Sequence, residues 1–96
     1  MFKVTAAALT VLDQAIAQEQ TNELEKLYVR LSMGIGWGGP QLKLSLEEQP
    51  ISGDQVHAFD HVDILIHEND FNYFDHTKLD YIKDVLGKGK FQLLKI

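Results

Sequence analysis

Two stretches of alternating apolar residues flank a glycine-rich segment, and this arrangement constrains the fold more than any other feature of the chain. Every second residue is apolar in 27–33 and again in 42–46. The apolar positions are Leu27, Val29, Leu31, Met33, Leu42, Leu44 and Leu46. A period of two is typical of a strand that buries one face. The sequence therefore predicts two half-buried strands, paired antiparallel and joined through the glycines.

The connecting segment, residues 34–40, holds four of the seven glycines and the only tryptophan, Trp37. Glycine readily adopts positive φ and lets another chain or a ligand approach closely, so a sharply bent, presented loop is expected. Consecutive amides could form a phosphate-binding nest, but the segment lacks the lysine and Ser/Thr of a P-loop. Two other interpretations stay open: the loop crosses close to another strand with Trp37 partly in the core, or it forms the lip of a small-molecule site.

The remaining patterns predict a mainly β chain with one long N-terminal helix. Apolar residues at three- and four-residue spacing indicate a helix over 6–20, which Thr5 is placed to cap. A short helix, capped by Asn69 or Asp70, is expected to end at Phe74. Further strands are predicted over 2–4, 56–59, 62–66, 79–82 and 90–96. The predicted fold is a small α+β, sandwich-like domain of six to seven short strands.

The alternation also assigns side chains to the two faces of the predicted strands. One face is expected to be buried as a group, and the opposite face is expected to remain unburied. The group expected to be buried is Leu31, Leu44, Ile64 and Ile66, and the group expected outside is Arg30, Lys43 and Asp63.

Composition excludes several classes of function. With 96 residues, 45% apolar and 24% charged, the chain has the composition of a soluble protein. Nine basic against fourteen acidic residues give a net charge of −5, which argues against a nucleic-acid binder, because such proteins need a basic surface. No apolar run approaches the roughly 20 residues that cross a bilayer, and residues 1–5 lack a signal-peptide hydrophobic region. We expect a cytoplasmic protein without membrane contact, folded as one domain over residues 1–96, alone or as a small homo-oligomer.

The segment 57–76 is rich in histidine and aspartate, and it is the alternative candidate for a metal site that would hold iron or zinc. His57 and His61, four residues apart, are the most closely spaced of its histidines. In a strand, residues four apart share a face but lie about 13 Å from one another. They could share a metal only if the chain turns at Asp60. No serine lies in a recognisable nucleophile elbow, so no enzyme activity is predicted.

Several short segments, taken in order, resemble the HesB/IscA-type iron–sulfur cluster biosynthesis domain, the family of the A-type cluster carriers. The strand that enters the glycine segment leads into Gly36-Trp37-Gly38-Gly39, where that family has a Gly-Cys-Ser-Gly loop. The other matching segments are Pro40 with Leu42 and Leu44, Gly53-Asp54-Gln55-Val56, Ile64-Leu65-Ile66-His67 and Leu79-Asp80-Tyr81. The resemblance covers nearly the whole chain and implies the HesB-like fold.

The departures from that family determine the expected function. The family's ligands are three cysteines, one in the loop and two in a Cys-Gly-Cys tail, whereas this chain has no cysteine and Trp37 takes the loop position. Thiolates hold such clusters, and an indole nitrogen only donates hydrogen bonds. The resemblance therefore implies a non-enzymatic, cysteine-free protein related to cluster assembly that has no cofactor and is not itself a carrier. It is expected to act through contacts with a protein partner, made by Gly36, Trp37, Gly38 and Gly39, with Trp37 at least partly exposed.

Overall fold

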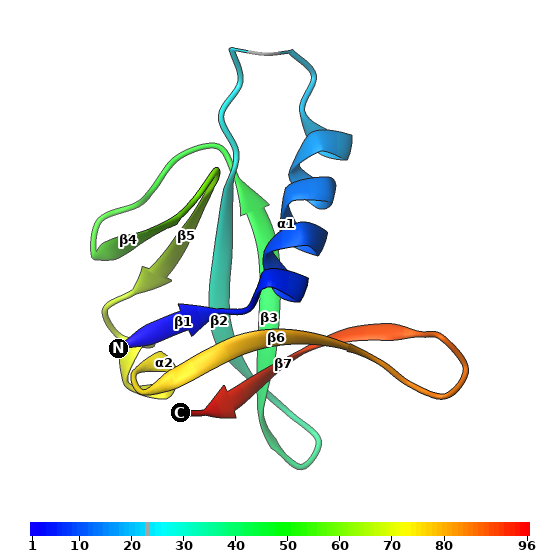
Figure 1. Ribbon diagram of the computed structural model, residues 1–96. Coiled ribbons are helices and arrows are strands. Elements are labelled where there is room, and N and C mark those ends of the chain that lie inside the picture. The colour runs from blue at the N-terminus through cyan, green and yellow to red at the C-terminus, as the bar shows by residue number, and fades with distance from the viewer. Residues whose placement is uncertain (23) are drawn as a thin grey trace.

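The computed structural model describes residues 1–22 and 24–96, which form two β-sheets and two helices (Figure 1). One sheet has the order β1-β6-β7, with β1 at Phe2–Val4, β6 at Thr77–Lys83 and β7 at Gly89–Lys95. The other has the order β3-β2-β5-β4, with β2 at Tyr28–Gly36, β3 at Gly39–Glu47, β4 at Asp54–Phe59 and β5 at Val62–His67. The helices are α1, Ala6–Glu19, and α2, Phe71–Phe74. The predicted mainly β, α+β sandwich is confirmed.

No helix within the described residues combines the length and the apolar composition that crossing a membrane requires.

Thr5 fixes the start of α1 to the three-stranded sheet. Its hydroxyl oxygen accepts a hydrogen bond from the amide of Ala8 (3.2 Å), as an N-cap does, and its hydroxyl donates to the carboxylate of Asp80 (2.7 Å). Its own amide donates to the carbonyl oxygen of Leu79 (2.9 Å). The predicted cap is confirmed, and the helix ends at Glu19, one residue earlier than expected. Strand β6 thereby sets where α1 begins.

Strand β2 lies inside the four-stranded sheet and pairs on both sides. Its antiparallel pairing with β3 runs from Tyr28 opposite Glu47 to Gly36 opposite Gly39, which confirms the predicted hairpin. Its other neighbour is β5, parallel to it, with Val29 opposite Ile64. Parallel neighbours cannot be joined by a tight turn, so the chain forms β3 and β4 before it returns to β2.

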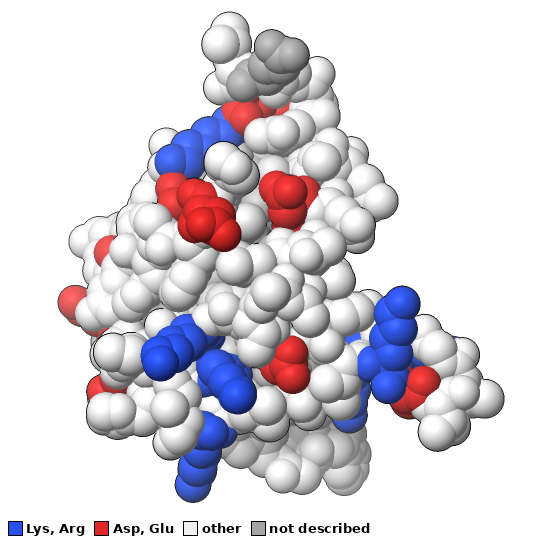
Figure 2. Space-filling view, viewed as in Figure 1, with Lys and Arg blue, Asp and Glu red and all other residues white. Residues whose placement is uncertain are grey.

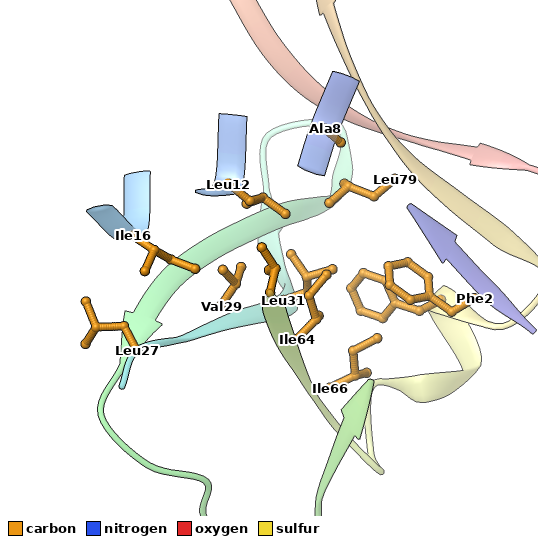
Figure 3. Close-up of a cluster of buried hydrophobic side chains, with 12 residues drawn as sticks. Phe2, Ala8, Leu12, Ile16, Leu27, Val29, Leu31, Ile64, Ile66 and Leu79 are labelled. Carbon is orange, nitrogen blue, oxygen red and sulfur yellow. The ribbon is translucent and has the colours of Figure 1, made fainter. Parts of the chain in front are cut away.

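The core lies between α1 and the inner face of the four-stranded sheet, and it continues under β1 and α2. Figure 3 shows Leu12 and Ile16 of α1 pointing toward Leu27, Val29 and Leu31. A second group of apolar side chains surrounds the aromatic ring of the first strand at the other end. The buried cluster comprises Phe2, Ala8, Leu12, Ile16, Leu27, Val29, Leu31, Val62, Ile64, Ile66, Phe74 and Leu79.

For one of the four leucine and isoleucine residues expected to be buried in this core, the prediction is wrong. Leu31, Ile64 and Ile66 are buried together, but Leu44 is only half-buried. Strand β3 forms the outer edge of its sheet, so no further strand covers the core-facing side chains from that side. Alternation identifies the face of a strand but does not show whether that strand is central or at an edge.

Arg30 was expected on the open face, yet its side chain is only 15% exposed. Its guanidinium donates two hydrogen bonds, both 2.7 Å, to the two carboxylate oxygens of Asp54, whose side chain is 0% exposed. A third contact, 3.3 Å, reaches the carboxylate of Glu47. The hydrogen bonds from Arg30 hold the pKa of Asp54 below its ordinary value. The long side chain thus reaches Glu47 on the neighbouring strand β3 and Asp54 on β4, which lies beyond β5, and alternation cannot predict such partners.

Asp63, also expected outside, is half-buried as well. Its carboxylate lies 2.6 Å from the amino group of Lys26. Lys43 alone of the three is fully on the outside, as predicted.

His57 belongs to an aromatic cluster around Phe2 of the first strand. Its ring stacks on Phe71, with centroids 5.7 Å apart and planes 6° apart, and it meets the edge of Phe2 at 6.0 Å. Burial lowers the pKa of His57, because the imidazolium loses its hydration there, and the nearby terminal amino group lowers it further. His57 therefore contributes to packing as a neutral ring.

The burial pattern predicts unequal effects of two leucine truncations. Leu31→Ala empties a fully buried position and should destabilise the protein by about 2–5 kcal/mol. Leu44→Ala removes less buried surface and should have a smaller effect, while Lys43→Ala should stay within about 0.5 kcal/mol. Urea unfolding followed by far-UV circular dichroism measures all three. Equal losses for Leu31→Ala and Leu44→Ala would contradict the edge position of β3.

The His57 environment predicts a pH dependence of stability. Because its folded pKa is lowered, the unfolded chain binds the proton at higher pH than the folded chain. The free energy of unfolding should thus decrease as the pH falls below the ordinary histidine value of 6.5. His57→Phe, which retains an aromatic ring but cannot titrate, should flatten this dependence in urea unfolding between roughly pH 5 and 7.

Asp54 and Asp75 affect stability in a separate, more acidic pH range. Their lowered pKa values contribute stability that is lost only as the pH falls through and below their ordinary value of 3.8. A slope between pH 5 and 7 that is unchanged in His57→Phe would show that His57 does not produce it.

Candidate functional site

The candidate site is the tip of the β2–β3 hairpin, residues 34–41. Pairing continues to Gly36 opposite Gly39, so the turn itself consists only of Trp37 and Gly38. The expected sharply bent, presented segment is thus a two-residue hairpin turn, and two of its four glycines, Gly34 and Gly36, lie within β2. Gly38 and Gly39 have φ of 89° and 117°, values that glycine adopts without strain. A two-residue turn with a positive-φ glycine in its second position holds Trp37 at the end of a regular strand pair.

Gly34 and Gly36 make room for side chains from the paired strand. A Cβ atom at Gly34 would lie 2.3 Å from Cε of Lys43, and one at Gly36 would lie 2.2 Å from Cδ of Gln41. The sequence predicted that these glycines permit a close approach, and the approaching groups are the Lys43 and Gln41 side chains. On this face of the hairpin, these two side chains lie across the backbone of the glycines.

Trp37 is fully exposed, with a relative accessibility of 102%. Figure 1 shows the β2–β3 turn at the bottom of the view, beyond both the three-stranded sheet and α1. The expectation of an exposed Trp37 is confirmed, and the interpretation that places it partly in the core is wrong. Its flanking glycines offer no side chain to pack on, and among residues 1–22 and 24–96 nothing covers the indole.

Ile35 is a member of this surface that sequence reasoning missed. It is 95% exposed, although it lies on the same strand face as Leu31 and Met33. The apolar face of β2 therefore continues past the body of the protein and ends uncovered beside Trp37. The signal was present, because the alternation that begins at Leu27 runs through Met33 to Ile35 and skips only glycines.

The tip is made of apolar residues, glycines and one amide side chain. Residues 34–41 include no ionisable side chain and no hydroxyl, and the first charged group along β3 is Lys43. A hollow of about 430 Å³ beside Ile35 and Trp37 opens to solvent. Enclosed, concave cavities are typical of small-molecule sites, so this shape does not favour the small-molecule interpretation.

The alternative metal site is not assembled by the fold. The chain does turn at Asp60, which has a φ of 51°, but His57 packs inward on Phe71 while His61 lies exposed in the β4–β5 turn. Within residues 1–22 and 24–96, no three His, Asp or Glu side chains gather in a way that could hold a metal ion. The structure thus does not bring His57 and His61 into one ligand set.

Comparison with known protein sequences identifies a relative. No family model matches the chain. A protein of Aquifex aeolicus strain VF5 is 32% identical over 89 residues, an alignment that covers 93% of this chain and 75% of that protein. Identity at this level over most of both chains shows common family membership.

Solved structures share the fold. Escherichia coli SufA, described as involved in biosynthesis of iron–sulfur clusters, superposes with a TM-score of 0.79 at 18% identity, covering 97% of this chain and 83% of SufA. IscA, solved with a 2Fe-2S cluster, superposes with a TM-score of 0.74 at 23% identity, covering 99% of this chain and 82% of IscA. An Aquifex aeolicus protein solved by solution NMR superposes with a TM-score of 0.76 at 26% identity, covering 99% of this chain and 91% of that protein. The chain therefore belongs to the family of its Aquifex aeolicus relative, as a cysteine-free protein with the HesB/IscA-type fold.

Proposed function

We propose that this chain is a non-enzymatic HesB-like domain, spanning residues 1–96, that takes part in iron–sulfur cluster assembly through protein contacts and does not carry a cluster. The observation that supports this most directly is Trp37. It is 102% exposed at the end of a regular hairpin, at the position where the sequence pattern of the family has its loop cysteine. The fold and the pathway are those of the relatives, and the ligand position has become a contact position.

Loss of the cluster follows from the available ligands. The chain contains no cysteine, and thiolates are the groups that hold iron–sulfur clusters in proteins. An indole nitrogen carries a hydrogen and has no lone pair to donate to iron. Lys43 and Gln41, the polar side chains nearest to the turn, are an ammonium donor and an amide, which are also poor ligands for iron.

The hairpin tip has the features of a protein-binding anchor. Trp37 and Ile35 present a large apolar area, and tryptophan is enriched among residues that dominate binding energy. The strand pairing up to Gly36 and Gly39 keeps the tip ordered, so binding needs little further ordering of the backbone. The proposed partner is a protein of the cluster assembly machinery, and neither nucleic acid nor a membrane is implied.

Reconstitution with iron and sulfide under reducing conditions should leave no bound cluster after desalting, because the chain offers no thiolate. Visible absorption and iron analysis of the desalted protein measure this. IscA, which has been solved with a 2Fe-2S cluster, is the positive control under identical conditions. A stoichiometric brown chromophore on this chain would contradict the proposal that it is not a carrier.

Trp37 should report directly on partner binding, since it is the only tryptophan in the chain. Its emission in the free protein should be that of an indole in water, and it should shift to shorter wavelength when a purified cluster-assembly protein from the same organism is added. Trp37→Ala should abolish binding in isothermal titration calorimetry. The same change should alter the free energy of unfolding by less than about 1 kcal/mol, because the indole packs on nothing.

Tyr73→Ala is the matched control for that experiment. Tyr73 is also an exposed aromatic residue, 52% accessible on α2, and its truncation should leave binding intact. If Trp37→Ala and Tyr73→Ala bind equally well, the hairpin tip is not the contact surface. A large loss of stability in Trp37→Ala would show that the indole is structural.

A further inference from the structure

An apolar groove opens between α1 and the outer strand β3, on the opposite part of the hairpin from Trp37. Its volume is about 600 Å³, and side chains of α1, β2, β3 and β7 line it. The apolar surface comes chiefly from Leu12, Leu27, Leu44, Leu46 and Phe91. Leu44, Leu46 and Phe91 are half-buried because this side of the core has no further cover. In the groove, apolar side chains that pack against the hydrophobic core remain partly exposed to solvent.

The rim of the groove is acidic. Glu19, Glu25 and Glu48 line it, and no lysine or arginine of the described residues does. The neighbouring Lys26 is paired with Asp63 at 2.6 Å. The amide of Thr21 donates to the Glu25 carboxylate (2.9 Å), and its hydroxyl does so too, which lowers the pKa of Glu25. An occupant of this groove should thus be apolar at its centre and positively charged around it.

The tip of the β6–β7 hairpin, residues 84–88, has that composition. Val85 is 101% exposed and Leu86 is 79% exposed. Basic side chains flank this apolar pair at the end of β6, in the turn and on β7. They are Lys83, Lys88 and Lys90. In Figure 2 the hairpin forms a lobe that stands out from the body and carries blue side chains, while red acidic side chains lie in the upper half of the view.

Asp84 holds this tip in one conformation. Its carboxylate accepts hydrogen bonds from the amides of Leu86 (2.8 Å) and Lys88 (3.0 Å). Its backbone amide donates to the carbonyl of Lys88 (2.9 Å), and the amide of Gly87, with a φ of 81°, donates to its carbonyl (3.0 Å). The single acidic side chain of the tip is therefore engaged within it, and two apolar side chains are presented on an ordered turn. Such preorganisation favours binding.

We propose that the β6–β7 tip of one copy of this chain inserts into the α1–β3 groove of a second copy, so that two copies form a closed dimer. Val85 and Leu86 would fill the apolar groove, and the flanking lysines would meet the glutamate rim. The two surfaces are neighbours on one molecule, because Phe91 of the groove follows Gly89, the first residue of β7, by two positions. A single two-fold axis beside β7 can then form both contacts at once.

The absence of cysteine allows an unambiguous crosslinking test. Val85→Cys is combined with Ser45→Cys, an exposed position that lines the groove. Mild oxidation should produce a covalent dimer, with a yield about tenfold above that of the control pair Val85→Cys and Lys3→Cys, since the contact raises the local thiol concentration. Lys3 is exposed on β1, away from the groove. A ladder of larger species, or a yield equal to the control's, overturns the two-fold dimer.

Charge reversal tests the same contact without crosslinking. Lys88→Glu and Glu48→Lys should each weaken self-association about tenfold in sedimentation velocity, and the double variant should regain it. Lys3→Glu, with the same change in net charge, should leave association unchanged, and circular dichroism confirms that each variant is folded. A wild-type protein that is monomeric at all concentrations overturns the proposal. So does association that survives both single reversals but is lost in Trp37→Ala.

This proposal and the one for Trp37 fail independently. The β6–β7 tip and the α1–β3 groove share no residue with the β2–β3 tip. If the protein dimerises but binds no partner, the dimer proposal is retained and the Trp37 proposal is rejected. If a monomer binds the partner, the Trp37 proposal is retained and the dimer proposal is rejected.

Discussion

The parallel pairing of β2 with β5 under α1 is the constraint on which the rest of the structure depends. Val29, Leu31, Ile64 and Ile66 face each other across this pair and are almost completely excluded from water. Burial of such side chains is the main favourable contribution to folding. Because this pair is central, its outer neighbours can be strands that are only partly covered. Strand β3 packs on the core through Leu42, Leu44 and Leu46, and the hairpin tip lies beyond the core.

Much of this fold could be predicted from local sequence patterns. Alternation identified β2, β3 and β5, and the Thr5 cap located the start of α1, because these features depend on neighbours a few residues apart. Apart from the β2–β3 hairpin, strand partners could not be predicted in the same way. The parallel pairings of β1 with β6 and of β2 with β5 join segments far apart in the sequence. For the same reason the pattern placed Arg30 on an open face and missed its ion pair with Asp54, the first residue of β4.

The candidate site shows the same division. The exposure of Trp37 followed from its flanking glycines, and Ile35 could have been recognised by extending the alternation two residues further. His57 and His61 appeared as a pair in the sequence, but β4 turns one inward and leaves the other in a turn. The α1–β3 groove could not be predicted from the sequence, since its walls come from four elements that meet only in the folded chain.

The outer edge of β3 bears on how this protein resists aggregation. Nine residues of edge strand offer unpaired backbone groups, and a long, flat edge of this kind is a template for strand addition and aggregation. Near the tip, Pro40 removes one donor, and Lys43 places a charge that another strand would have to bury. The glycines under Lys43 and Gln41 also weaken the β propensity of the tip. The residues that surround the exposed Trp37 thus also disfavour uncontrolled strand addition at this edge.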